Sequence, residues 1–229
     1  MAGKLYGIGV GPGDPELMTL KAVRLIEECD IVAVPKSGEG EGVARQIAKG
    51  AVKDFEQKNV IEVSMPMTRD PQVLEQSHQA AAQLIEGYLK EGKSVAFLTL
   101  GDPAIYSTYI YVHKRVQQHN YPVEMVPGVP SFCAVAAKLN TGLAEGAQPL
   151  HIIPASYQGV EEGLEWSGPK VLMKTGRSMK KVKALLDEKG LLDKAMMVQK
   201  CGMEGEEIYP SMRDVDENAS YFSVIVVEE

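Results

Sequence analysis

The sequence has few cysteines, no long apolar run and no excess of positive charge. Its three cysteines, Cys29, Cys133 and Cys201, are odd in number and far apart, so they fit neither a disulfide framework nor a metal cluster and suit a reducing cytosol. No apolar run approaches the length of a membrane span, and the amino-terminal MAGKLYGIGV lacks the long apolar region of a signal peptide. We therefore predict a cytoplasmic protein with no membrane contact.

The charge balance disfavours a further class of partner. The formal net charge is −7 at pH 7, which argues against non-specific binding to nucleic acids but does not exclude a local basic pocket. The four histidines, at positions 78, 113, 119 and 151, show no metal-ligand spacing. We expect neither a nucleic-acid partner nor a resident metal.

The 229 residues are enough for one large domain or two compact ones, and their composition is that of a soluble globular protein. In the first half, apolar runs alternate with helical patterns. We predict strands at residues 4–10, 30–34, 60–63, 94–99 and 123–126, with Pro35 ending the second, and helices at 20–29, 43–52, 71–91 and 105–118. This alternation predicts a parallel-rich α/β sheet with helices on both faces.

The second half differs from the first in its sequence pattern: it is richer in predicted strands and in glycine-containing loops. It begins near Pro127–Pro130 (PGVP), a stiff joint. We predict helices at 131–139 and 178–189, and strands at 151–154, 171–174, 196–199 and 222–227. We place a domain boundary near residues 120–130, which gives domains at 1–124 and 125–229.

A first candidate loop, GVGPGDPE, spans Gly9–Glu16 and follows the first predicted strand. A dinucleotide-binding loop needs a third glycine where this one has Asp14, and Pro12 and Pro15 each remove a backbone donor. Asp14 would also repel a phosphate. A simpler interpretation is that Asp14 caps a helix, with Thr19 as a rival cap. Capping leaves the glycines unexplained, and such glycines indicate that something approaches the backbone closely.

A second candidate loop, TLGDPAIYST, follows the strand predicted at 94–99, at the kind of strand end where open α/β sheets bind ligands. Gly101 permits close approach, Asp102 supplies a carboxylate, and Tyr106 offers an aromatic ring with a hydroxyl. A plain turn with an aspartate cap before a helix at Ile105 explains the loop equally well. A third loop, VPGVPSF at residues 126–132, is either a rigid hinge, the simpler interpretation, or a preorganised ligand wall.

In this order and spacing, the three loops resemble those of the tetrapyrrole methylases of the cobalamin pathway, which use S-adenosylmethionine. The marks are G-x-G-P-G-D-x-x-L-x-T at Gly9–Thr19, L-G-D-P-x-I-Y-S-T at Leu100–Thr108 and P-G-V-x-S-F at Pro127–Phe132. MPMTRD (Met65–Asp70) and LMKTGR (Leu172–Arg177) narrow the resemblance to the branch that methylates C20 of precorrin-2 or cobalt-factor II. The similarity extends nearly end to end.

The resemblance implies a fold of two α/β/α domains with the cofactor cleft between them, and usually a homodimer. It implies S-adenosylmethionine as donor and S-adenosylhomocysteine as product. The donor would contact Pro12, Leu100, Gly101, Asp102, Ile105, Tyr106, Pro130, Ser131, Met173, Lys174 and Gly202. Because this chain has Pro130 where the family generally has a hydroxyl residue, we expect only a backbone contact at that position.

The implied substrate is a tetrapyrrole whose propionate and acetate groups call for Arg and Lys. Arg69 and Arg177 are the candidates, with Lys174 at the same strand end as Arg177. Gly11 and Asp14 of the first loop would also lie beside the substrate. The lysines that follow Arg177 are more simply a solvated helix face. A metal would arrive only with the substrate.

Methyl transfer from a sulfonium is an in-line displacement at carbon, so alignment and exclusion of water should be the main contributions of the enzyme. Tyr106 is our hypothesis for a residue beside the reacting centre.

Several alternatives stay open. One is methylation of another ring position, of the uroporphyrinogen III or precorrin-4 type. Another is methylation of RNA or of a protein side chain by an enzyme of the same fold. The negative net charge disfavours RNA as the substrate. A nucleotide-binding regulatory module would leave the later loops without a purpose. Nothing in the sequence separates precorrin-2 from cobalt-factor II.

Overall fold

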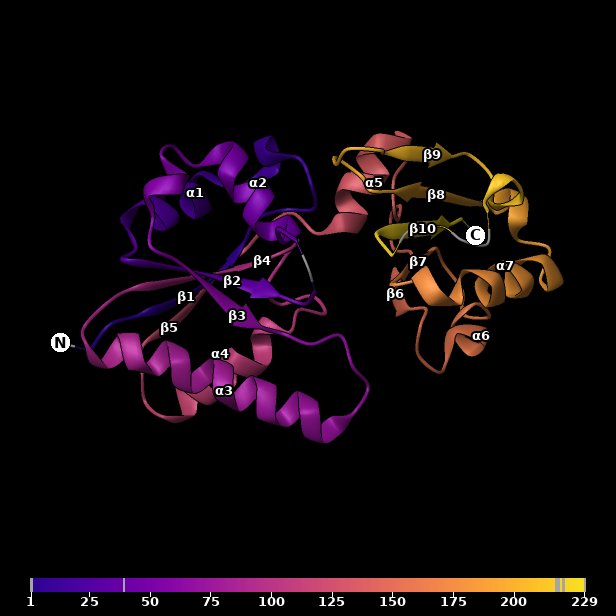
Figure 1. Ribbon diagram of the computed structural model, residues 1–229. Coiled ribbons are helices and arrows are strands. Elements are labelled where there is room, and N and C mark those ends of the chain that lie inside the picture. Colours follow the sequence, from indigo (N-terminus) through magenta and orange to yellow (C-terminus); the bar gives the residue numbers. More distant parts are fainter. Residues whose placement is uncertain (1, 39, 217–218, 220, 229) are drawn as a thin grey trace. The chain divides into compact units, whose positions relative to one another are not determined.

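The computed structural model describes residues 2–38, 40–216, 219 and 221–228, and for Arg177 the backbone only (Figure 1). The chain divides into two compact units, Met1–Pro130 and Ser131–Glu229. The boundary expected after residue 124 would cut strand β5 (Val123–Val126), which pairs with the first sheet along its length. The division therefore follows Pro130. Within the described ranges, no helix combines the length and apolarity needed to cross a membrane.

The first unit is built on a sheet with the strand order β3-β2-β4-β1-β5. Its other strands are β1 (Leu5–Gly9), β2 (Ile31–Lys36), β3 (Val60–Ser64) and β4 (Val95–Thr99). Every pairing is parallel, and all of β4 is buried, as expected of a strand covered on both faces. The parallel-rich sheet predicted from the sequence is confirmed.

Strand β2 continues past Pro35, where the sequence predicted its end. Beyond Ala33, β2 no longer pairs with β4 and pairs with β3 alone. A residue without an N–H is tolerated in such an edge-like position.

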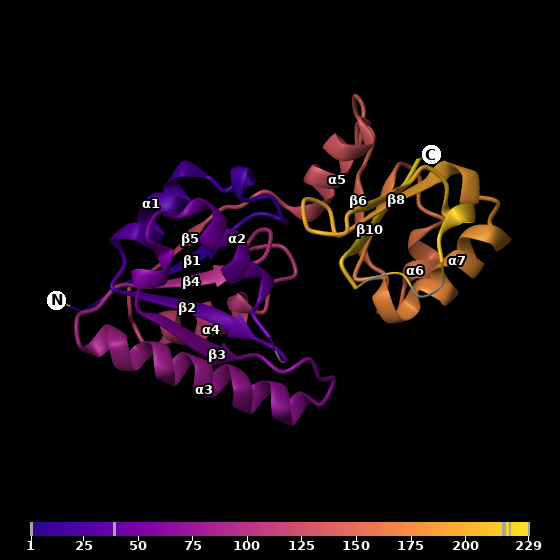
Figure 2. The same ribbon diagram turned by 45° about the horizontal axis from the view of Figure 1, so that its top comes forward.

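Helices cover both faces of this sheet, as Figures 1 and 2 show from two directions. The helices are α1 (Leu20–Glu28), α2 (Val43–Ala51), α3 (Pro71–Lys90) and α4 (Tyr109–Gln118). Leu25 of α1 and Ile47 of α2 join one buried cluster. Ile85 of α3 and Val112 of α4 join another on the opposite face. The predicted two-sided covering is thus confirmed for the first unit.

The second unit has a mixed sheet with the strand order β6-β7-β10-β8-β9. The strands are β6 (His151–Pro154), β7 (Lys170–Met173), β8 (Ala195–Gln199), β9 (Glu207–Tyr209) and β10 (Ser223–Val227). Strand β10 is antiparallel to both β7 and β8, whereas β6 is parallel to β7. Strands β6, β7 and β8 therefore run in one direction and end at the same edge of the sheet.

Three helices accompany this sheet: α5 (Ser131–Leu139), α6 (Val160–Gly163) and α7 (Met179–Glu188). Leu186 of α7 shares a buried cluster with Ile225 of β10. Val224 and Val226 of β10 are also buried and belong to the other face, because strand residues alternate. Helix α5 contacts β10 and β8. The short elements β9 and α6 were not predicted from the sequence.

Candidate functional site

Three loops of the first unit meet at one edge of its sheet. They follow β4, β1 and β5, which are neighbours in the sheet and run in parallel, so their carboxyl ends coincide. The first two loops are joined by backbone hydrogen bonds: Gly11 N donates to Gly101 O over 3.3 Å, and Gly101 N donates to Gly11 O over 2.7 Å. The first two predicted loops are therefore joined to each other through their backbones.

Close packing between these loops explains their glycines. A Cβ at Gly9 would stand 2.6 Å from both the carbonyl oxygen of Gly101 and the amide nitrogen of Gly128. A Cβ at Gly128 would overlap the same carbonyl oxygen and lie 2.8 Å from the carbonyl carbon of Gly9. The close approach expected at the first loop is thus made by the backbone of the other two loops.

Asp102 ties the second loop to the third. Its Oδ1 accepts a hydrogen bond from Ala104 N over 2.7 Å, and its Oδ2 accepts one from Gly128 N over 3.0 Å. The expected helix does not begin at Ile105 but at Tyr109. The correction has a local cause: the cap closes a turn on Ala104, and Tyr106 then leaves the helical region with a φ of 49°. Asp102 therefore shapes two loops at once.

Tyr106 is held in a strained position near the tip of the second loop. It is 45% exposed, and a left-handed φ is uncommon for a bulky residue and often marks a functional position. The loop is fixed behind it, because Ser107 Oγ lies 2.6 Å from Thr99 Oγ1 and accepts from Tyr109 N over 3.2 Å. The structure thus presents an aromatic ring and a phenol on a rigid support.

The half-buried side chains of Leu100 and Ile105 belong to the same loop. Leu100 packs against the core that includes Ile8.

The aspartate of the first loop is a helix cap. Asp14 Oδ1 accepts from Glu16 N over 2.9 Å at the start of a 3-10 turn, Pro15–Leu17. Thr19 Oγ1 accepts from Ala22 N over 3.1 Å and caps α1, so the two rival caps are both used. Gly11 and Pro12 of the same loop are buried.

The remaining predicted residues of this part of the chain are Arg69, Pro130 and Ser131. Arg69 is exposed in the segment after β3, the edge strand, which β2 and β4 separate from β1. Pro130 is half-buried and is the last residue of the first unit, while Ser131 begins α5 of the second.

In the second unit, the predicted residues lie at the edge where β7 and β8 end. Met173 ends β7, and Lys174 follows it, half-buried with a left-handed φ of 57°. Burial lowers the pKa of Lys174. Gly202 lies in the turn after β8 and donates its N–H to Glu206 Oε2 over 2.7 Å, which lowers the pKa of Glu206, as does its pairing with Lys138.

Arg177 lies in the 3-10 turn Gly176–Ser178, and its side chain falls outside the described part of the chain. Two residues at this edge were missed by the sequence reasoning. Thr175 is fully buried, and Lys200 follows β8 with a φ of 51°. The signal was the repeated pattern K-x-G after two apolar runs, at Lys174–Gly176 and Lys200–Gly202.

Among the described residues, no three His, Cys, Asp or Glu side chains are grouped so that they could hold a metal ion.

Residues 4–215 match the family model described as Tetrapyrrole (Corrin/Porphyrin) Methylases. A cobalt-precorrin-2 C(20)-methyltransferase of Salmonella typhimurium is 33% identical over 100% of this chain and 98% of its own length. A precorrin-2 C(20)-methyltransferase of a Sinorhizobium species is 29% identical over 98% of this chain and 95% of its own. The cobalamin biosynthesis protein CobIJ of Mycobacterium tuberculosis is 36% identical over 98% of this chain, which spans 46%, or about half, of that relative.

Solved structures show the same fold at lower identity. The cobalt precorrin-4 methyltransferase CbiF aligns with a TM-score of 0.76 and 22% identity, covering 98% of this chain and 94% of that one. A uroporphyrin-III C-methyl transferase from Thermus thermophilus, complexed with S-adenyl homocysteine, aligns with a TM-score of 0.74 and 20% identity over 99% and 98% of the two chains.

Proposed function

Because the chain belongs to the tetrapyrrole (corrin/porphyrin) methylases, we propose that it transfers a methyl group from S-adenosylmethionine to C20 of precorrin-2 or cobalt-factor II in cobalamin biosynthesis. The observation that carries this proposal is the similarity to two C(20)-methyltransferases over 98% or more of the chain. The second product is S-adenosylhomocysteine.

The residues proposed for the donor fit a ligand that combines an aromatic base with an amino acid. The exposed Tyr106 belongs to the same loop as the half-buried apolar residues Leu100 and Ile105. In the second unit, Met173 ends β7 and is half-buried, and Gly202 is exposed in the turn after β8. The proposed donor set is Pro12, Leu100, Gly101, Asp102, Ile105, Tyr106, Pro130, Ser131, Met173, Lys174 and Gly202.

The roles within this set differ. Both carboxylate oxygens of Asp102 accept hydrogen bonds from the protein backbone, so its main contribution is to set the shape of the two loops that face the donor. S-adenosylmethionine supplies an electrophilic methyl group on a sulfonium. Rigid loops can hold the reacting atoms in line, and orientation of this kind lowers a barrier by about 7–11 kcal/mol.

C20 of the acceptor is an electron-rich ring carbon, so no strong base is needed to make the nucleophile, and its proton leaves after transfer. Tyr106 is the residue proposed beside the reacting centre, because its hydroxyl is carried by a strained, exposed residue of a fixed loop. A Tyr106→Phe variant tests the role of the hydroxyl. An unchanged methylation rate would remove Tyr106 from the mechanism.

The acceptor's carboxylates call for cations at the site. Arg69 and Arg177 are the residues proposed for this, and Gly11 and Asp14 are proposed to line the acceptor's side of the first loop. Asp14 is already engaged as a cap, so its contact with the substrate would be through the oxygen that does not accept from Glu16.

We also propose that the protein is a cytoplasmic homodimer. Among the described residues, none of the three cysteines forms a disulfide, which suits a reducing compartment. Analytical ultracentrifugation tests the dimer, and a monomer at micromolar concentration would contradict it.

The decisive experiment is incubation with methyl-labelled S-adenosylmethionine and, separately, precorrin-2, cobalt-factor II, precorrin-4 and uroporphyrinogen III. We expect label at C20 of one of the first two, located by NMR of the product. Label on precorrin-4 or uroporphyrinogen III alone would assign another ring position. Transfer to none of the four, from a protein that binds S-adenosylhomocysteine in calorimetry, would refute the substrate class and leave the donor site intact.

A further inference from the structure

Thr99, the last residue of β4, is bonded to both of the loops that follow β1 and β4. Its carbonyl oxygen accepts from Val10 N of the first loop over 3.0 Å, and its hydroxyl lies 2.6 Å from Ser107 Oγ of the second loop. Thr99 is 8% exposed, so its hydroxyl relies on a partner within the protein. Thr99 therefore ties the sheet to two of the three loops of the site.

Ser107 holds the second loop at its other end. Besides contacting Thr99, its hydroxyl oxygen accepts over 3.2 Å from the N–H of Tyr109, the first residue of α4. Tyr109 is fully buried, and its ring fills the space beside Gly7, where a Cβ would overlap it. The Tyr109 hydroxyl lies 3.0 Å from Nδ1 of His113. The Ser107 hydroxyl thus connects the end of β4 to a helix start that is itself locked in the core.

Tyr106 lies between two fixed points of the chain. On its amino-terminal side, Asp102 accepts from two loop amides, and on its carboxyl-terminal side, Ser107 contacts Thr99. The φ of Tyr106 is 49°, a conformation that costs a bulky residue free energy and persists where the surrounding structure enforces it. The hydroxyl pair that directly follows Tyr106 is therefore placed to set the position of the phenol.

The backbone proposed to contact the donor is held by other bonds. Gly101 exchanges hydrogen bonds with Gly11 in both directions, and Leu100 packs against the core that includes Ile8. Neither interaction involves the Ser107 hydroxyl. Loss of that hydroxyl should therefore displace Tyr106 while leaving this part of the proposed donor site in place.

We propose that the Thr99 and Ser107 hydroxyls act as a pair that positions Tyr106 and thereby sets the rate of methyl transfer but not the affinity for the donor. A misplacement of about 1 Å at a reacting centre can cost about 100-fold in rate, so a small shift of the loop is enough. The proposal rests on the role proposed for Tyr106, and it adds Thr99 and Ser107 as positioning residues.

The first test is Ser107→Ala. Its kcat with the tetrapyrrole should fall about tenfold or more, because the phenol is no longer held in line. The Kd for S-adenosylhomocysteine, measured by calorimetry, should stay unchanged. Thr99→Val should behave in the same way, and Thr99→Ser, which keeps the hydroxyl, should retain most of the rate.

A second test asks whether Ser107 acts through Tyr106. In a Tyr106→Phe background, Ser107→Ala should lower kcat no further, because the hydroxyl that it positions is already absent. Losses that multiply would show that Ser107 acts independently of Tyr106 and would overturn the proposal.

The double variant Thr99→Val, Ser107→Ala separates positioning from stability. Ser107→Ala alone leaves the buried Thr99 hydroxyl without its partner and should lower the urea midpoint. Removal of both hydroxyls should recover much of that loss, because no buried polar group is then orphaned. The kcat of the double variant should stay low. Recovery of kcat together with stability would assign the pair a structural role alone.

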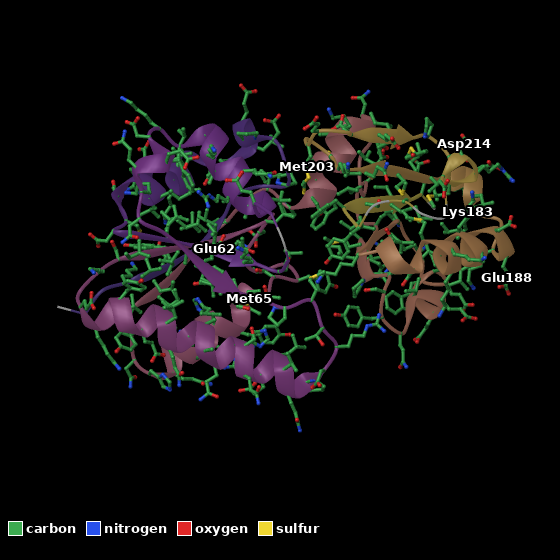
Figure 3. All side chains as sticks on the ribbon, in the orientation of Figure 1. Glu62, Met65, Lys183, Glu188, Met203 and Asp214 are labelled. Atoms are coloured by element: carbon green, nitrogen blue, oxygen red, sulfur yellow. The ribbon has the colours of Figure 1, made fainter. Side chains whose placement is uncertain are left out.

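Two controls match these variants in the same sheet. Ser94 lies just before β4, at the strand's opposite end, where its hydroxyl donates to Asp30 Oδ2 over 2.7 Å and accepts from Asp30 N over 3.1 Å. Glu62 of β3, labelled in Figure 3, forms an ion pair with Lys36. Neither Ser94→Ala nor Glu62→Gln should change kcat.

The remaining outcomes are distinct. An unchanged kcat in Ser107→Ala would overturn the proposal, and so would a loss of affinity for S-adenosylhomocysteine as large as the loss of rate. Absence of methyl transfer by the wild type, which has both hydroxyls, would refute the proposed function itself and with it this proposal.

Discussion

The strand-end loops of the two units are built in opposite ways. In the first unit, the loops after β1, β4 and β5 satisfy each other: glycine backbones pack together, and Asp102 uses both oxygens on loop amides. In the second unit, the turns after β7 and β8 leave the Thr175 hydroxyl unpartnered within the described residues and hold two lysines in a strained backbone region.

This difference suggests that the loops of the two units have different functions. Loops whose polar groups are hydrogen-bonded to one another have a fixed shape before any ligand binds. Such a fixed shape suits the alignment of reacting atoms. A polar group left without a partner among the described residues, such as the Thr175 hydroxyl, suits the recognition of a ligand that completes its interactions. Three substitutions test whether the contrast holds, and a fourth tests an ion pair at the start of β5; they are ordered by the size of the expected effect.

The largest effect is expected for Gly128→Ala in the first unit. The new Cβ would overlap the carbonyl oxygen of Gly101, which is backbone and cannot rotate away. We expect the free energy of unfolding to fall by about 3 kcal/mol, as for other overpacked positions, measured by urea denaturation. Gly87→Ala is the control, because Gly87 lies in α3 with nothing near its Cβ position and alanine favours a helix. Equal stability of the two variants would show that the loops are not tightly joined.

Asp102→Ala should have the next largest effect. It removes acceptors from two backbone N–H groups, and we expect a loss of about 2 kcal/mol in the free energy of unfolding. Affinity for S-adenosylhomocysteine should fall as well, because the two loops lose their link; calorimetry measures it. Asp14→Ala, which removes a single cap bond, is the comparison and should cost only about 1 kcal/mol. A lost affinity without any loss of stability would mean that Asp102 acts on the donor directly.

Thr175→Val is expected to act in the opposite direction. It replaces a buried hydroxyl that makes no hydrogen bond among the described residues with a methyl group of similar shape, so the free protein should gain about 1 kcal/mol. Thermal unfolding without ligand measures the gain. A loss of stability in the free protein would show that the hydroxyl has an internal partner, and the contrast between the units would fail.

The smallest effect concerns Glu124 of β5. Hydrogen bonds from Lys21 and Lys4 lower its pKa to about 2. A carboxyl with a lowered folded-state pKa stabilises the protein above its unfolded pKa of about 4.3, and that stability is lost as the pH falls towards 2. Because the group is partly exposed, Glu124→Gln should cost less than about 1 kcal/mol at pH 7. The two proteins should become equally stable near pH 2, measured by urea denaturation across pH; a difference that persists there would exclude an electrostatic cause.

Much of the fold could be predicted from the sequence, because apolar runs and helix caps are local signals. The runs around Val95 and Ile31 gave buried strands, and Asp70 and Pro71 mark the start of α3. Strand β9 was missed because its three residues are exposed or half-buried and carry no apolar pattern. The start of α4 was misplaced because Asp102 closes a turn on Ala104 and Tyr106 then has a left-handed φ, which no helix propensity encodes.

The site was predicted in part for a similar reason. The motifs pointed to Asp102 and Lys174, but not to how Asp102 is used, because its partner Gly128 is near it only in space. Lys200 gave no signal as a single residue. The position of β10 between β7 and β8 could not be predicted either, because this topology depends on antiparallel pairing across distant segments.

The packing of Gly9, Gly101 and Gly128 also has a consequence for the order of folding. These residues are far apart in the chain, so their contact closes long loops whose entropy must be overcome before the contact stabilises anything. During synthesis the contact cannot form until β5 and Gly128 have left the ribosome. Intermediates that lack this segment will lack the packing that joins the three loops. We expect the first unit's share of the proposed donor site to form late, with the last strand of that unit rather than with its first.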